Sequence, residues 1–157
     1  MFNRDELSDH ERDTHHTLAA GLFNHVWSLM DTGGRSREQD DEMLNAAHAS
    51  RYHWSLVGNA KNLSIGEWQI SRVYAILGRA EPAMFHGQRN LKICQDNNLD
   101  AFVLGFAYES LARAAAVAGD AVGRDDYLKH ANAAASRIKK KKDRQMLEKD
   151  LGQIEEM

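Results

Sequence analysis

The chain has 157 residues, of which 43% are hydrophobic and 27% charged, the composition of an ordinary globular protein of one domain. Its formal net charge of -3 gives no general attraction to nucleic acid, which we therefore do not expect as a partner. One cysteine excludes an internal disulfide, and no apolar run approaches the roughly 20 residues that a membrane span needs. The polar residues that open the chain are unlike a signal peptide, so we expect a cytoplasmic protein with no membrane contact.

Signals for helix starts occur along the whole chain, and signals for strands do not. Three serines are each followed three residues later by an acid or an amide. This is the pattern of a capping box, in which each side chain accepts from the backbone N–H of the other residue. The boxes pair Ser8 with Glu11, Ser36 with Gln39, and Ser64 with Glu67. Asp100 and Asp120 can cap two further helices, because aspartate accepts from the first unpaired N–H groups.

Glycines predict where helices end. Gly34, Gly78 and Gly119 each follow a helical pattern and stand where a left-handed C-terminal cap is common. Together, the start and stop signals predict seven helices. They run over residues 9–32, 37–57, 65–77, 82–97, 101–118, 121–137 and 143–155. Phe102 and Phe106 lie on the apolar stripe of the fifth of these helices.

The middle of the chain has a recognisable layout. The segment from Tyr74 to Gly78 ends one helix, and after a short turn the next helix opens with the small residue Ala83. This layout resembles the tetratricopeptide repeat, a helix–turn–helix unit of ~34 residues. The turn glycines recur at longer intervals than that, and aligning the units on them makes Val26, Ile70 and Leu111 correspond.

The resemblance implies an all-α, right-handed α-solenoid of about three helix pairs, closed by a C-terminal capping helix. The units are expected at residues 9–57, 64–97 and 100–138, and the capping helix at 143–155, all in a single domain over residues 1–157. Met146, Leu147, Leu151 and Ile154 form the apolar stripe with which the last helix would cover the third unit.

The resemblance also implies a function. In this family the first helix of each unit lines a concave groove that binds a protein or peptide segment, and the proteins act as adaptors or regulatory modules. The groove positions correspond to Asn24, Ser28, Trp68, Arg72, Glu109 and Arg113. Arg72 and Arg113 occupy equivalent positions and could clamp a partner's acidic side chain or free carboxylate. Alternatively, Arg113 pairs with Glu109 one helical turn before it, and Arg72 makes a local cation–π contact with Trp68.

The histidines support a competing hypothesis, a helical protein that binds a metal or a small molecule. Most of them fall in the first two predicted helices, where a site could assemble across helices. The candidate ligands are His25, His48, His53 and Glu67. His48 and His53 do not have the His-x-x-x-His spacing that places two ligands on one helix face. Histidines that bond to a carboxylate or to the backbone are commoner than ligands, so we expect no metal and no cofactor.

The run from His48 to Trp54 is dense in aromatic and polar side chains. We interpret it as an aromatic seam between helices. The alternative is a polar pocket of His48, Tyr52, His53 and Trp68. No Ser-His-Asp order, phosphate loop or paired-carboxylate motif accompanies the run, so we expect no enzyme. Trp27 and Met30, if exposed on an incomplete first unit, would favour a homodimer.

Overall fold

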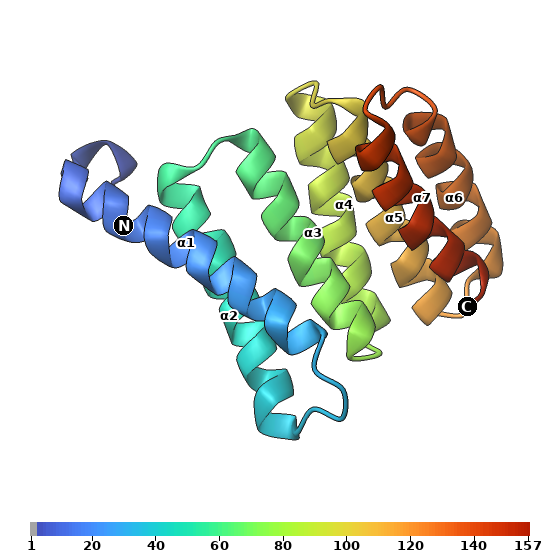
Figure 1. Ribbon diagram of the computed structural model, residues 1–157, viewed down its shortest axis with the longest axis horizontal. Coiled ribbons are helices and arrows are strands. Elements are labelled where there is room, and N and C mark those ends of the chain that lie inside the picture. Colours follow the sequence, from blue (N-terminus) through green and yellow to red (C-terminus); the bar gives the residue numbers. More distant parts are fainter. Residues whose placement is uncertain (1–2) are drawn as a thin grey trace.

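The computed structural model describes residues 3–157, and over that range the chain is helical, with no strand. After a short 3-10 turn at Arg4–Glu6, seven α-helices follow, as the sequence predicts (Figure 1). They are α1 (Asp9–Met30), α2 (Arg37–Val57), α3 (Ala60–Ile76), α4 (Ala80–Asp96), α5 (Ala101–Val117), α6 (Ala121–Ala135) and α7 (Lys141–Glu155). Among the described residues, no helix is both long enough and apolar enough to cross a membrane.

Capping side chains determine where the helices start, and two of the three predicted boxes are present. Ser8 and Ser36 each form the reciprocal box with the residue three positions on. The third prediction, at Ser64, is wrong, because α3 starts directly after Asn59, which forms the same box with Asn62. Asparagine caps a helix as well as serine does. The earlier signal therefore sets the helix start and leaves Ser64 buried in the interior of α3.

Left-handed residues end several helices. Gly78 and Gly119 have φ of 70° and 74° at the ends of α3 and α5, as predicted. The N–H that follows each glycine bonds back to a carbonyl in the last helical turn, which satisfies an otherwise unpaired acceptor. Helix α4 ends in the same way on Asn98 with φ of 48°, a conformation that asparagine tolerates. No glycine marks this helix end in the sequence. The predicted caps Asp100 and Asp120 are confirmed.

The helices pack as consecutive hairpins in a repeat-like stack. Helix α1 packs on α2, α3 on α4, and α5 on α6 (Figure 1). Neighbouring pairs meet through α2 with α3 and through α4 with α5. The first helices of the pairs also touch, α3 and α5 extensively but α1 and α3 only narrowly. Val26, Ile70 and Leu111, which correspond in the predicted alignment, are all buried, so equivalent positions have equivalent roles in the core.

Helix α7 covers the last helix pair. Its Leu147, Leu151 and Ile154 are buried in a cluster with side chains of α5 and α6, and burying each contributes about 1.5–3 kcal/mol. Gly105 in α5 lets α7 come close, because a Cβ at this position would collide with the Leu147 side chain. Met146 departs from the predicted stripe: it is 55% exposed and lines a pocket between α7 and the preceding helices.

Candidate functional site

Three side chains of α3 and α5 converge on the carboxylate of Glu109. Arg72 Nη1 donates to Oε1 over 3.0 Å, and Arg113 Nε, in the predicted i,i+4 pair, donates to the same oxygen over 2.8 Å. The indole Nε1 of Trp68 donates to Oε2 over 2.7 Å. Glu109 is completely buried, so these charged and polar hydrogen bonds take the place of its water shell.

Helix α7 adds a second carboxylate at the edge of this network. Asp150 Oδ2 is 3.7 Å from Arg72 Nη1, and the Asp150 carbonyl accepts from Arg113 Nη2 over 3.4 Å. Burial raises the pKa of Asp150, the charge of Glu109 raises it further, and the two arginines oppose both effects. Burial likewise lowers the pKa of Arg72, against the opposing charge of Glu109. The network contains two guanidiniums and two carboxyl groups, and it ties together α3, α5 and α7.

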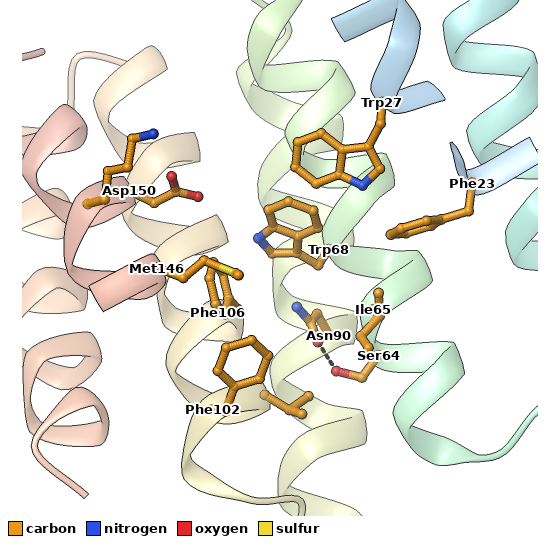
Figure 2. Close-up of a pocket in the computed structure, with 12 residues that line it drawn as sticks. Phe23, Trp27, Ser64, Ile65, Trp68, Asn90, Phe102, Phe106, Met146 and Asp150 are labelled. Atoms are coloured by element: carbon orange, nitrogen blue, oxygen red, sulfur yellow. Dashed lines mark hydrogen bonds between the residues drawn. The ribbon is translucent and has the colours of Figure 1, made fainter. Parts of the chain in front are cut away.

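A pocket of about 410 Å³ opens beside this network, between α1, α3, α4, α5 and α7 (Figure 2). Most of its lining is apolar. We call it the aromatic pocket and define it by Phe23 and Trp27 of α1, Trp68 of α3, Phe102 and Phe106 of α5, and Met146 of α7. Pockets that hold small molecules or anchoring side chains are of this size and have this apolar character.

The rings of the aromatic pocket contact one another around Trp68. Its ring centroid is 5.6 Å from that of Trp27 and 5.7 Å from that of Phe106, the latter edge to face. Phe102 and Phe106 are 5.0 Å apart. They are spaced i,i+4 on α5, as Phe23 and Trp27 are on α1, so both rings of each pair lie on one helix face. Each helix thus contributes its aromatic side chains to the pocket through its own periodicity.

Two buried polar side chains, Ser64 and Asn90, also line the aromatic pocket. Ser64 Oγ donates to Asn90 Oδ1, and the Cys94 sulfur lies 3.2 Å from Ser64 Oγ. Burial raises the pKa of the Cys94 thiol, which keeps it neutral. The Asn90 Nδ2 has no hydrogen-bond partner in the described part of the chain.

The predicted groove residues divide among the network, the pocket and the open surface. Trp68 lines the aromatic pocket, and Arg72 lies 6.0 Å from its ring centroid, in the expected cation–π contact. The carboxylate that Arg72 and Arg113 hold in common belongs to the chain itself. Asn24 and Ser28 are exposed on α1.

Sequence reasoning missed Asn90, Phe102 and Phe106 as site residues. The two phenylalanines lie on an apolar stripe, and such stripes ordinarily face a core. Asn90 did offer a signal. It lies between Gly87 and Cys94 on the buried face of α4, where an apolar side chain is the usual choice.

The candidate ligands His25, His48, His53 and Glu67 are not gathered into one cluster, although His48 and Glu67 both contact His86. The three histidines have three different partners. These are Glu42 for His25 at 2.7 Å, the Tyr74 hydroxyl for His48 at 3.0 Å, and His15 for His53 at 2.8 Å. Within residues 3–157, no three His, Cys, Asp or Glu side chains are arranged to hold a metal ion.

Glu67 instead forms a buried charge cluster with side chains of α2 and α4. Its carboxylate accepts from Arg51 Nε over 3.0 Å and from His86 Nδ1 over 2.6 Å, and Arg89 Nε is 3.3 Å away. Burial alone would raise the pKa of Glu67, but the His86 hydrogen bond and the two guanidinium charges lower it. The ionised carboxylate therefore links α2, α3 and α4.

The run from His48 to Trp54 forms contacts between helices, as interpreted from the sequence. The Trp54 ring meets His16 of α1 edge to face at 5.1 Å, and the His48 ring meets Tyr74 of α3 at 5.8 Å. Tyr52 is half exposed. Trp68 lies in the aromatic pocket, so the alternative polar pocket that included it is not formed.

Fold and site together define an all-α, repeat-like protein with an aromatic pocket beside a buried charge network. No family model, no curated protein and no solved structure matches the chain. The pocket is therefore the feature from which its function is inferred.

Proposed function

We propose that this protein is a binding module of the tetratricopeptide type, and that it holds a segment of a partner protein in its concave groove. One apolar side chain of that segment inserts into the aromatic pocket and serves as the anchor. The observation that carries the proposal is the aromatic pocket itself, with Trp27 36% exposed and Met146 55% exposed at its edge.

Apolar surface of this kind favours an occupant. Large exposed hydrophobic side chains that border a pocket are typical of interaction sites, since covering them removes apolar surface from water. Burying one Leu-sized or aromatic anchor is worth about 1.5–3 kcal/mol, before the cost of ordering the segment is subtracted. Interfaces commonly depend on a few such anchors in well-packed pockets.

The charge network sets a limit on what the partner contributes. A partner carboxylate would have to compete with Glu109 and Asp150 for Arg72 and Arg113, which already have internal partners. We therefore assign recognition to the apolar anchor, and we assign to the arginines the task of holding Trp68 and α7 in place. Trp68 belongs to both groups, because its indole N–H faces Glu109 and its ring lines the pocket.

The family assignment has its own support. Helix hairpins repeat along the stack, left-handed glycines end α3 and α5, and equivalent apolar positions are buried in all three pairs. In a right-handed solenoid of such pairs, the first helices α1, α3 and α5 line one face, and these helices supply five of the six residues that define the aromatic pocket.

Peptide selection tests the proposal directly. Random peptides displayed on phage are selected on the full chain, and the affinities of enriched peptides are measured by titration calorimetry. Met146→Glu places a charge at the edge of the aromatic pocket, whereas Val122→Glu makes the matched change on α6, at a position that is 83% exposed. We expect Met146→Glu to weaken binding at least about tenfold and Val122→Glu to leave it unchanged. Peptides that bind both variants equally would rule out the aromatic pocket as the site.

A homodimer is the competing use of the same surface. If Trp27 and Met146 were covered by a second copy of the chain, sedimentation would show a dimer that Met146→Glu dissociates. A monomer at all concentrations would leave the pocket to a different partner.

A further inference from the structure

We infer that the aromatic pocket selects an aromatic ring that carries a neutral hydroxyl, and that Asn90 recognises this hydroxyl. The inference rests on the proposed function and specifies the chemistry of the anchor. A phenol has this chemistry, and it can be the side chain of a tyrosine in a partner or a free small molecule.

Asn90 is the buried polar group of the pocket that the fold itself leaves unsatisfied. The residue is 1% exposed, yet its Nδ2 has no hydrogen-bond partner among the described residues, while its Oδ1 accepts from Ser64. Figure 2 shows the amide nitrogen on the side turned away from Ser64, below Trp68 and to the right of Phe106. A buried N–H without a partner destabilises the folded protein. A ligand that supplies an acceptor would therefore form a hydrogen bond that the fold itself does not provide.

A hydroxyl suits this amide better than other polar groups do. It can accept from the N–H and it can also donate to a carbonyl oxygen, so it satisfies an asparagine amide in either orientation about its last torsion. A carbonyl on the ligand could only accept. The hydroxyl is the group that meets the amide whichever end faces the aromatic pocket.

The surrounding rings favour an aromatic occupant. Trp68 and Phe106 meet edge to face, and Phe102 lies beside Phe106, so the walls present both faces and edges to a further ring. A phenol places its ring against these walls and its oxygen at the far end. Buried tyrosines in proteins use the same combination of an apolar body and a polar tip.

The charges of the site favour a neutral group. Glu109 is already paired with Arg72 and Arg113, so these two guanidiniums are not free to hold a ligand anion. Lys149, the cation among the described lining residues, is exposed on α7 next to Asp150. Asp150, the carboxylate of the pocket lining, is drawn in Figure 2 to the left of Trp68, whereas Asn90 is drawn below Trp68. The polar neighbours of Asn90 are the uncharged Ser64 and Cys94, so an anionic group placed beside Asn90 would lose its hydration without a cation in contact, and a neutral hydroxyl avoids that cost.

Two probes that differ by one hydroxyl test the inference on the full chain: p-cresol and toluene. Their dissociation constants are measured by NMR titration for the wild type, for Ser64→Ala, and for the double variant Ser64→Ala with Asn90→Leu. Ser64→Ala keeps the amide of Asn90, so it separates the effect of losing Ser64, which also lines the pocket, from the effect of losing the amide. The double variant replaces both members of a buried hydrogen bond with apolar groups, a change that is often nearly neutral for folding, and thermal unfolding checks that it is folded.

We expect the wild type and Ser64→Ala to bind p-cresol about tenfold more tightly than toluene, and the double variant to prefer toluene. If the wild type binds toluene as tightly as p-cresol, and both probes change the NMR signals of Trp68 and Phe106, the inference about Asn90 is wrong but the apolar pocket remains the binding site. If neither probe changes these signals, both the inference and the proposed pocket fail.

A third probe distinguishes the two sources of a phenol. N-acetyl-Gly-Tyr-Gly-amide is compared with its phenylalanine analogue and with p-cresol. Tighter binding of the tyrosine peptide than of p-cresol assigns the site to a side chain of a partner. Weaker binding assigns it to a small phenol.

Discussion

The indole N–H of Trp68 donates to the buried carboxylate of Glu109 over 2.7 Å, across the boundary between α3 and α5. This bond joins the two parts of the site, because the Trp68 ring lines the aromatic pocket while its nitrogen belongs to the charge network. The orientation of the Trp68 ring is thereby tied to Glu109, which carries no exposed surface. Removing that group should affect both the stability of the fold and the shape of the pocket.

Glu109→Gln is the first prediction. The substitution leaves Arg72 and Arg113 buried without the carboxylate that both of them hold. Breaking a buried ion pair from one side typically costs about 3–5 kcal/mol, so we expect a loss of that size in the free energy of unfolding measured with urea. Glu148→Gln is the control, since Glu148 is half exposed and pairs with Arg144 at 3.7 Å. It should change stability by less than about 0.5 kcal/mol.

Asp150→Asn, unlike Glu109→Gln, should increase the stability of the fold at neutral pH. Burial and Glu109 raise the pKa of Asp150, so the folded chain binds this proton more tightly than the unfolded chain does. Stability is therefore lost as pH rises from about 3.8 through the folded pKa, and asparagine removes that loss. We expect the variant to melt at a higher temperature than the wild type at pH 7. A lower melting temperature would show that the Arg72 contact outweighs the cost of burial.

Glu67→Gln tests the second buried carboxylate through its pH dependence. The pKa of Glu67 is below its ordinary value of 4.5 in the folded chain, so its stabilising effect is complete above that pH and is lost as pH falls through the folded pKa. Urea unfolding of wild type and variant is compared from about pH 5.5 to pH 3, a range that spans the ordinary pKa of a glutamate. The difference in the free energy of unfolding between wild type and variant should become smaller as the pH falls. A constant difference would mean that Glu67 does not titrate in this range.

Replacing glycine by alanine should lower the stability of the fold at one position and raise it at another. Gly78 has φ of 70° at the end of α3, where an added Cβ is strained, so Gly78→Ala should destabilise by about 1–2 kcal/mol. Gly152 lies within α7 with open space around the position of a Cβ. Gly152→Ala should stabilise by about 0.5–1 kcal/mol, because alanine loses less conformational freedom in a helix. Thermal unfolding of both variants checks the pair, and equal signs would contradict the assigned backbone conformations.

The seven helices could be predicted from the sequence, because the signals for helix starts and ends are local. Caps, turn glycines and apolar periods each lie within a few residues of the boundary that they mark, and Ser8, Ser36 and Gly78 all act as predicted. The exception is instructive. Ser64 has the same local pattern as the two serine caps, but α3 starts earlier, at the capping box that Asn59 forms with Asn62.

The site was harder to predict, because it depends on where helices distant in sequence come to lie. The pairing of Glu109 with Arg113 is local, and their i,i+4 spacing predicts it. The contacts of Arg72 with the same carboxylate and with Asp150 depend on the packing of α3, α5 and α7. Whether Phe106 faces a core or an open pocket likewise depends on how closely α1 approaches α3, which no local pattern encodes.

The most direct test of the binding proposal is an NMR structure of the full chain with an enriched peptide. The proposal predicts nuclear Overhauser contacts between one apolar or phenolic side chain of the peptide and the rings of Trp68 and Phe106. Contacts confined to Phe85 or Tyr52, the half-exposed aromatic residues outside the pocket, would contradict it.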